Sequence, residues 1–223
     1  MRVKRILFCI LGVLTAVNLT ATDYLSTRYV DGEFVSECAV DAAAPLSVCD
    51  SVVADLVEQI TSDYERLFTW AFKGLGRQGN DDERDEVVIT IKESTFDKMS
   101  GLCHMVADIE VSRVTTFRDI ALDSRVLQTK LADGTTRVDV DIFYSNSFLK
   151  KAYGTFFVKS LSDTRCEMRI QIHVRFGWFF NLFITQKRFR NIVEWRMQEF
   201  MRNLRTEAEK RYTQQLFEGY FIQ

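Results

Sequence analysis

The spacing of hydrophobic residues changes twice along the chain, from a helical period to a strand period and back. Over residues 46–71 the apolar positions recur every three or four residues, which is typical of an amphipathic helix. These positions are Val52, Leu56, Ile60, Tyr64, Leu67 and Ala71. Pro45, with Ser47 and Asp50 in a capping pattern, predicts where this helix begins. We expect a short strand before it over residues 34–40, and a flexible lead-in over residues 22–32.

From Val87 the period becomes two, which predicts β-strands. Apolar and polar residues alternate over 87–91, 105–111, 136–144 and 165–176, so each strand has one dry and one wet face, as in an antiparallel sheet. Asp133-Gly134 is a hairpin signal that joins a strand over 125–131 to the one over 136–144. Residues 162–164 are expected to join a strand over 152–161 to the last strand.

The helical period returns over residues 186–215, where the apolar positions occupy about half of the helical wheel. A sheet with one dry face needs a cover, and this long helix is the natural one. The sequence therefore predicts an α+β fold in which an antiparallel sheet of about seven strands grips a long C-terminal helix, with an early helical segment after the first strand. We expect a single domain over residues 33–216 and a tail over 217–223.

The first residues predict export. Residues 1–5 are basic, residues 6–17 are apolar, and the segment up to Ala21 ends in small residues, which is the layout of a signal peptide over 1–21. The apolar run is shorter than a membrane span and contains Thr15. Cleavage after Ala21 would leave a periplasmic or secreted chain with a net charge of −5.

Composition narrows the class of protein. Hydrophobic residues make up 47% and charged residues 27% of the 223-residue chain, which is the balance of a globular protein and excludes a disordered one. The whole chain has a net charge of −2, which argues against nucleic acid as a partner.

Two local segments resemble the START-like superfamily, also called SRPBCC or helix-grip, which includes polyketide cyclases and lipid-transport proteins. Val40–Val48, with its Ala-Pro pair, resembles the strand-to-helix junction of cyclase-like members. Asp163–Arg165 and Asn203–Glu209 resemble the C-terminal third of that superfamily. The resemblance implies a helix-grip fold and binding of a hydrophobic ligand, with catalysis as the exception. The chain departs from the pattern in its continuous first helix and in lacking a Gly-rich loop between early strands. A lipocalin-like barrel and a cystatin- or cone-like sheet are the competing folds.

The sequence offers no convincing catalytic or metal site. Asp139 and Asp141 share a strand face, but they alternate with apolar residues and should point to water. The same reasoning applies to His173, and His104 is expected at a surface or an edge. We therefore expect no catalytic residue, no metal and no cofactor. Four cysteines follow the predicted signal peptide, and their pairing remains open: Cys38, Cys49, Cys103 and Cys166.

The dry faces of the sheet and the last helix would converge on a hydrophobic ligand site. Seven strand residues and three helix residues are candidates to line it: Val140, Ile142, Tyr144, Phe156, Ile172, Val174 and Phe176, with Val193, Met197 and Phe200. The expected partner is a hydrophobic small molecule or lipid. The alternatives are a non-catalytic envelope domain in which these residues fill a core, and a cyclase- or aromatase-like enzyme, which would need a polar pair inside the pocket.

The segment between the last strand and the last helix breaks the alternation. Consecutive aromatic residues cannot all face inward, so at least one should be exposed. Cations follow in the first turn of the helix, where the helix dipole disfavours positive charge. Residues 186–212 contain eight Lys/Arg and four Glu, which favours contact with an anionic membrane. The predicted gate or membrane contact comprises Trp178, Phe179, Phe180, Lys187, Arg188 and Arg190. The alternative is that the aromatic residues plug the open end of the sheet.

Overall fold

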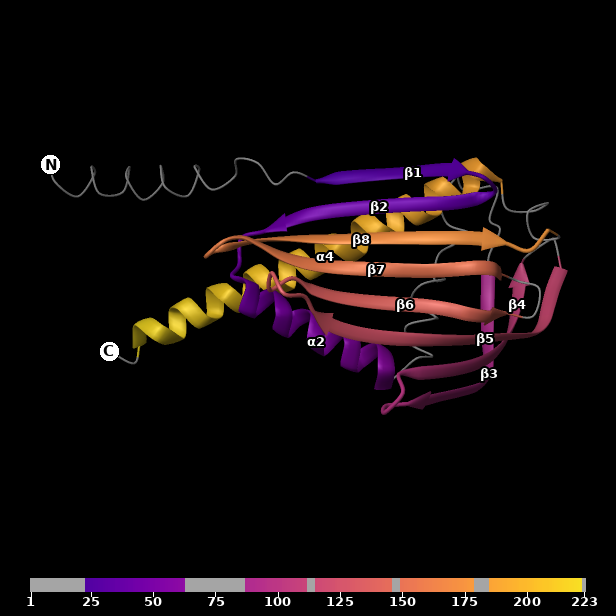
Figure 1. The fold of residues 1–223 in the computed structure, drawn as a ribbon, viewed down its shortest axis with the longest axis horizontal. Coiled ribbons are helices and arrows are strands. Elements are labelled where there is room, and N and C mark those ends of the chain that lie inside the picture. Colours follow the sequence, from indigo (N-terminus) through magenta and orange to yellow (C-terminus); the bar gives the residue numbers. More distant parts are fainter. Residues whose placement is uncertain (1–22, 63–86, 112–114, 146–148, 179–184, 222–223) are drawn as a thin grey trace, which may run out of the picture.

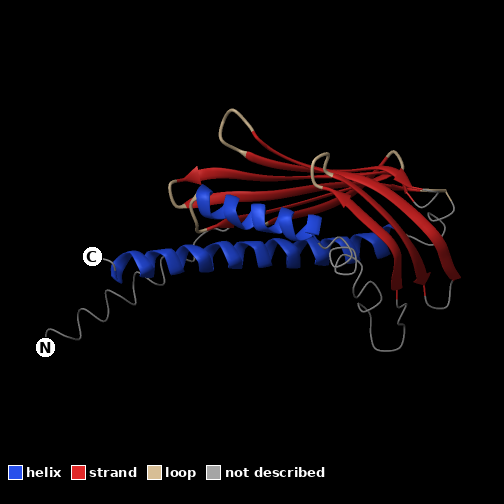
Figure 2. Ribbon diagram, turned by 90° about the horizontal axis from the view of Figure 1, so that it is seen from below, coloured by secondary structure: helices blue, strands red, loops and turns tan. Residues whose placement is uncertain are grey.

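A single antiparallel sheet of eight strands carries two helices on one of its faces (Figures 1 and 2). This computed structural model describes residues 23–62, 87–111, 115–145, 149–178 and 185–221. The elements are β1 (Tyr24–Val30), β2 (Glu33–Ala42), α2 (Leu46–Ser62), β3 (Val87–Asp97), β4 (Leu102–Val111), β5 (Thr115–Lys130), β6 (Thr136–Ser145), β7 (Leu149–Ser162), β8 (Arg165–Phe176) and α4 (Gln186–Phe221). The strand order is β1-β2-β8-β7-β6-β5-β4-β3, so β2 closes onto the last strand of the chain.

The N-terminal edge of the sheet corrects one prediction. The expected flexible lead-in over residues 22–32 instead contains β1, which pairs along its whole length with β2. Asp31 and Gly32 form the turn between them with φ values of 52° and 80°. Positive φ at both central residues is the requirement of a tight type I′ hairpin turn, so Asp31-Gly32 was the signal for this hairpin. The predicted signal peptide at residues 1–21 lies outside the described residues.

The later hairpins are confirmed. Residues 163–164 connect β7 to β8, within the predicted connection over 162–164. The β5–β6 hairpin also forms, although its loop is longer than two residues: the Leu131 amide donates to the Thr135 carbonyl, and the Gly134 amide donates to the Leu131 carbonyl. Gly134 has a φ of 82°, which suits a three-residue loop with glycine in the left-handed conformation.

Both predicted helices are present, with different ends. Helix α2 begins at Leu46, so Ser47 lies inside its first turn rather than at the cap. Asp50 does not complete a capping pair either, because it accepts hydrogen bonds from Thr136 Oγ1 at 2.6 Å and Lys130 Nζ at 2.9 Å, which tie α2 to the β5–β6 hairpin. The predicted extension of this helix to residue 71 lies outside the described residues beyond Ser62. Helix α4 continues to Phe221, so most of the expected tail is helical.

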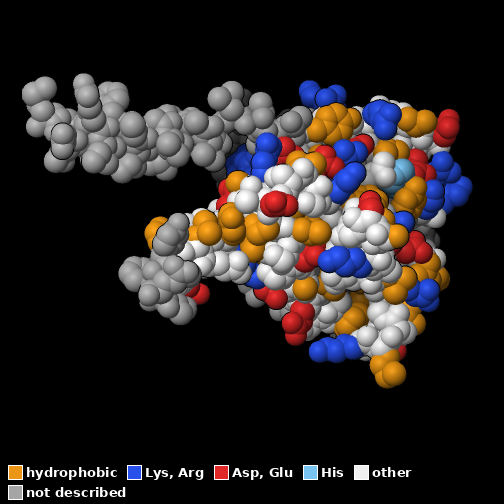
Figure 3. All heavy atoms as spheres, turned by 60° about the vertical axis from the view of Figure 1, so that its left-hand side comes forward, with side chains coloured by type: hydrophobic (Ala, Val, Ile, Leu, Met, Phe, Trp, Pro, Cys, Tyr) orange, Lys and Arg blue, Asp and Glu red, His pale blue; other side chains and the backbone are white. Residues whose placement is uncertain are grey.

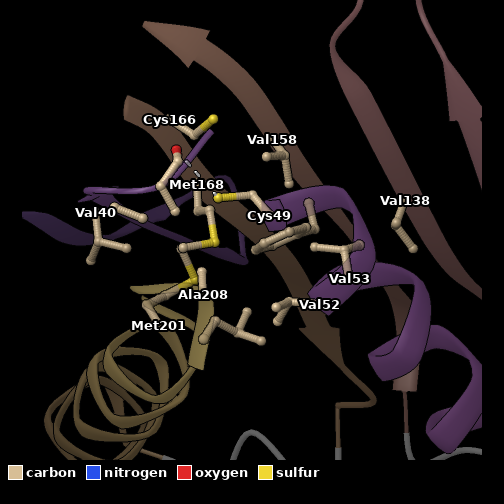
Figure 4. Packing of buried hydrophobic residues seen from close by; sticks show 14 of the residues in the cluster. Val40, Cys49, Val52, Val53, Val138, Val158, Cys166, Met168, Met201 and Ala208 are labelled. Carbon is tan, nitrogen blue, oxygen red and sulfur yellow. Dashed lines mark hydrogen bonds between the residues drawn. The ribbon is translucent and has the colours of Figure 1, made fainter. Parts of the chain in front are cut away.

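The space between the sheet and the helices contains two apolar clusters. Cluster 1 lies where both helices meet β2, β7 and β8, and it includes Val158, Met168 and Met201, all at 0% exposure (Figure 4). Cluster 2 lies nearer β3–β5 and the start of α4. There Phe189 of α4 stacks on Phe34 of β2, with ring centroids 4.0 Å apart. The two clusters fix α4 along the inner face of the sheet.

Candidate functional site

Nine of the ten predicted ligand-lining residues belong to these clusters. Phe156 and Met197 belong to cluster 1, and four more of the predicted residues pack against it: Val140, Ile172, Val193 and Phe200. Phe176 belongs to cluster 2, and Ile142, Val174 and Val193 pack against it, so Val193 contacts both clusters. The sequence pattern therefore identified correctly which side chains face one another across the sheet and α4.

The exception is Tyr144, whose side chain is 49% exposed. The register between β5 and β6 shifts at this point: Ser124 pairs with Ile142, whereas Asp123 pairs with Tyr144, so Phe143 is an extra residue. A β-bulge of this kind interrupts the alternation of side chains. The prediction that Tyr144 shares the inner face with Ile142 is wrong for this reason.

The nine inner residues are not equally buried. Phe156, Phe176 and Met197 are at most 8% exposed, as expected for a packed core. The other six remain half-buried: Val140, Ile142, Ile172, Val174, Val193 and Phe200. Aliphatic side chains on the dry face of a sheet normally lose nearly all contact with water. The middle of the inner face is therefore covered less completely than cluster 1.

The position of α4 accounts for this difference. Its backbone approaches β1, β2, β8 and α2, and it stands farther from β5, β6 and β7. Long side chains bridge part of the separation, as where the Phe200 ring meets the Phe156 ring edge-on at 6.4 Å between centroids. Short side chains such as Val140 cannot reach as far, which leaves space beside them.

The fully buried polar groups described on the inner face of the sheet are hydroxyls and thiols, and α4 adds Arg196, whose side chain is 12% exposed and lies 3.8 Å from the Glu199 carboxylate. Ser36 and Ser124 are 1% and 0% exposed, and Ser36 exchanges a 3.1 Å hydrogen bond with Thr27. Burial raises the pKa of Cys103, an effect that a hydrogen bond with Ser124 partly opposes, so this thiol stays protonated at neutral pH. Hydroxyls and thiols of this kind can orient a ligand.

The predicted wet face carries ion pairs that cross the strands. Asp139 accepts hydrogen bonds from Arg137 and Thr155, while Asp141 is exposed. His173 Nδ1 lies 2.8 Å from Glu33 Oε1, and its ring stacks on Tyr153 at 4.3 Å. Partial burial would raise the pKa of Glu33, but its hydrogen bonds with His173 and a neighbouring lysine outweigh that effect and lower it. The face visible in Figure 3 likewise mixes acidic and basic side chains.

All four described cysteines are free thiols. Cys49 of α2 and Cys166 of β8 are both fully buried, and Cys49 Sγ donates a hydrogen bond to the Ala44 carbonyl oxygen at 3.9 Å (Figure 4). The interaction of the Cys49 thiol with Cys166 is the main cause that raises the pKa of Cys49, and burial is the second. Among the described residues, no group of three or more His, Cys, Asp or Glu side chains is arranged to hold a metal ion. No helix in the described part of the chain combines the length and the hydrophobicity needed to cross a membrane.

The predicted gate is described only in part. Trp178 is 79% exposed, which agrees with the expectation that at least one aromatic residue faces outward. Lys187 and Arg190 are exposed at the start of α4, and Arg190 pairs with Glu194 at 3.0 Å. Phe179, Phe180 and the side chain of Arg188 lie outside the described residues.

The sequence pattern did not predict that Phe143 of β6 is 55% exposed, because its exposure depends on the bulge in that strand.

No protein-family model and no curated protein sequence matches the chain. Among solved structures, it is similar to the Zhui aromatase/cyclase from a Streptomyces species, with 15% identity, 80% of this chain and 95% of that chain covered, and a TM-score of 0.45. Norcoclaurine synthase from Thalictrum flavum shows 12% identity over 83% of this chain and 99% of that chain, with a TM-score of 0.43. A START superfamily protein from Mycobacterium smegmatis shows 13% identity over 81% and 97%, with a TM-score of 0.37.

The chain has the helix-grip arrangement that its sequence predicted: an antiparallel sheet wraps a long C-terminal helix, and an early helix follows β2.

Proposed function

We propose that the protein is exported and binds a hydrophobic small molecule or lipid between the inner face of the sheet and α4. The observation that carries this proposal is the set of half-buried aliphatic residues in the middle of an otherwise dry face, including Val140, Ile172 and Val193. An apolar ligand placed there would remove their remaining surface from water, at roughly 25 cal/mol per Å² of apolar area. Export rests on the layout of residues 1–21.

Native mass spectrometry of protein purified from its own cells tests the ligand. We expect a bound mass that solvent extraction releases, and we expect the emptied protein to bind an apolar fluorescent probe. Val193→Trp should block probe binding, because the larger ring would occupy the space between α4 and β6–β8. Arg202→Trp is the matched control, since residue 202 is exposed on the same helix. If no ligand is recovered and no probe binds, the inner face is a filled core and the protein is an envelope structural or interaction domain.

A peripheral membrane contact is the second part of the proposal. Trp178 is exposed and lies two residues beyond the end of β8. The start of α4 lies close to the end of β8, because the Phe189 ring meets the Phe176 ring edge-on at 5.7 Å between centroids. Lys187 and Arg190 are exposed on this first part of α4. An aromatic side chain beside cations suits the headgroup region of an anionic bilayer. Vesicles of phosphatidylglycerol should therefore sediment the protein better than vesicles of phosphatidylcholine.

Trp178→Ser and Lys187→Glu should each weaken binding to phosphatidylglycerol vesicles, whereas Lys210→Glu, at an exposed position far along α4, should matter less. Equal sedimentation of all variants in folded form would show that the aromatic residues plug the end of the sheet instead. Intact-mass measurement of protein from the envelope fraction decides the question of export, and a mass that includes residues 1–21 would contradict it.

A further inference from the structure

A further hollow has walls from β3, β4, β5 and β6 and borders cluster 2, because its wall residue Cys103 belongs to that cluster and Phe96 packs against it. Its volume is about 440 Å³. Its walls are Thr95, Phe96, Asp97, Leu102, Cys103, His104, Asp123 and Phe143. Cross-strand pairing places Thr95, His104 and Asp123 directly opposite one another, so three neighbouring strands present polar groups to the same spot.

The polar part of this hollow is a histidine–carboxylate pair. His104 Nδ1 makes a short contact with Asp123 Oδ1. A carboxylate at Nδ1 holds the neutral ring in the tautomer with a proton on Nδ1, which leaves Nε2 as a hydrogen-bond acceptor. The His104 side chain is 42% exposed, so a ligand can reach it.

The other histidine of the chain shows that such a pair does not by itself make a site. His173 also has a carboxylate at Nδ1, but its side chain is 17% exposed, and its ring is covered by Tyr153. His173 lines neither this hollow nor the one between α2 and the β3–β4 turn. His104 differs because a hollow and an uncovered aromatic ring adjoin it.

The apolar part comes from Phe143; Phe96 also borders the hollow, but its side chain packs against cluster 2. Phe143 is 55% exposed because it is the extra residue of the β6 bulge, and bulges frequently re-aim side chains beside functional sites. The remaining acidic group, Asp97, accepts hydrogen bonds from Ser100 Oγ at 2.6 Å and the Met99 amide at 2.9 Å, which lower its pKa. The rim therefore keeps negative charge and disfavours an anionic ligand.

We propose that this hollow is a binding site for a small aromatic molecule that carries a hydroxyl group and no acidic group. The ring packs against Phe143, and the hydroxyl donates to His104 Nε2. His104 and Asp123 face away from cluster 2, because their strand neighbours Cys103, Met105 and Leu122 lie in it. The proposal therefore stands whether or not the space between the sheet and α4 holds a ligand.

NMR of the two histidine rings tests this proposal with 2-naphthol as the probe. The His104 ring signals should shift in a saturable way on titration, whereas the His173 signals should stay in place. Two relatives of the probe give the chemical controls: 2-methoxynaphthalene lacks the donor and 2-naphthoate carries a negative charge. Each should bind at least tenfold more weakly than 2-naphthol.

Phe143→Ala and His104→Gln should each reduce the affinity for 2-naphthol about tenfold, and His173→Gln should leave it unchanged. Both altered side chains are substantially exposed, so the variants should fold, which their amide spectra will show. Val193→Trp separates this site from the inner one, because it should not change the His104 response. Unmoved His104 signals at saturating 2-naphthol, or wild-type affinity in both variants, would overturn the proposal.

Discussion

Matched valine truncations on the inner face distinguish a ligand space from a filled core. Val158 of β7 is 0% exposed inside cluster 1, whereas Val140 of β6 is half-buried beside the same cluster. A Val→Ala change removes two methyl groups, each worth about 0.8 kcal/mol when fully buried, and leaves a cavity where the surroundings cannot relax. Val158→Ala should therefore lower the free energy of unfolding by about 2–3 kcal/mol.

Val140→Ala should cost about 1 kcal/mol or less in ligand-free protein, because part of the side chain already contacts water and little new cavity forms. Urea unfolding followed by tryptophan fluorescence measures both values, and an unchanged slope with denaturant confirms that only stability has changed. Equal losses for the two variants in ligand-free protein would refute the reasoning, since they would show that the side chains of both valines are equally packed.

Two further predictions concern the turn after β3 and the first residue of β2. Gly101→Ala should lower the free energy of unfolding by at least about 2 kcal/mol, because φ is 68° and the added Cβ would lie 2.4 Å from the carbonyl oxygen of Val126. Gly134→Ala is the control: φ is 82° but no atom lies within 4 Å of the added Cβ, so the cost should be about 1 kcal/mol. Similar melting temperatures for the two variants would contradict this prediction. Glu33 has a lowered pKa in the folded protein, so its contribution to stability is complete above the ordinary carboxyl pKa and is lost as the pH falls below it. In the wild type the urea midpoint of unfolding should therefore decline between about pH 5 and pH 3, and Glu33→Gln should make this decline less steep. An equally steep decline in the variant would show that the hydrogen bond with His173 contributes nothing to stability.

Sequence pattern predicted the strands that have one buried face and failed where neither face is buried. The β8 residues alternate so regularly that their inner and outer sets follow from the period alone. Edge strand β1 has no such pattern, because all of its residues keep some contact with water, and only the Asp31-Gly32 turn signal could have located it. At Tyr144 the period was present but a bulge interrupted it, and bulges have no dependable sequence signature.

The candidate site shows a similar division between what the sequence determines locally and what the fold determines. The choice of facing residues followed from periodicity, so nine of the ten lie where they were expected. Their degree of burial depends instead on how far α4 stands from the central strands, a distance that no local pattern encodes. The hollow beside His104 arises from cross-strand pairing of residues 95, 104 and 123, which lie in three separate strands.

The dimensions of the elements explain why the inner face is covered unevenly. Eight strands about 4.8 Å apart make a sheet about 34 Å wide, whereas a helix with its side chains is about 10 Å across. Helix α4, with 36 residues, is about 54 Å long and spans the whole length of the sheet, but α2, with 17 residues, is only about 25 Å long. Two described helices can therefore lie side by side over one end of the inner face, and only α4 continues over the rest.

The end with two helices is where side chains such as Met168 and Met201 lose all contact with water, and the half-buried residues Val174 and Ile142 lie beyond it. A ligand that bound beyond the reach of α2 would supply the apolar contacts that α2 supplies at the other end. This predicts where its stabilising effect should appear: binding should protect the backbone amides of β6 and β8 near Ile142 and Val174 from hydrogen exchange more than those near Val138 and Met168, which are already buried. Uniform protection along both strands would indicate that ligand acts on global stability without occupying this part of the inner face.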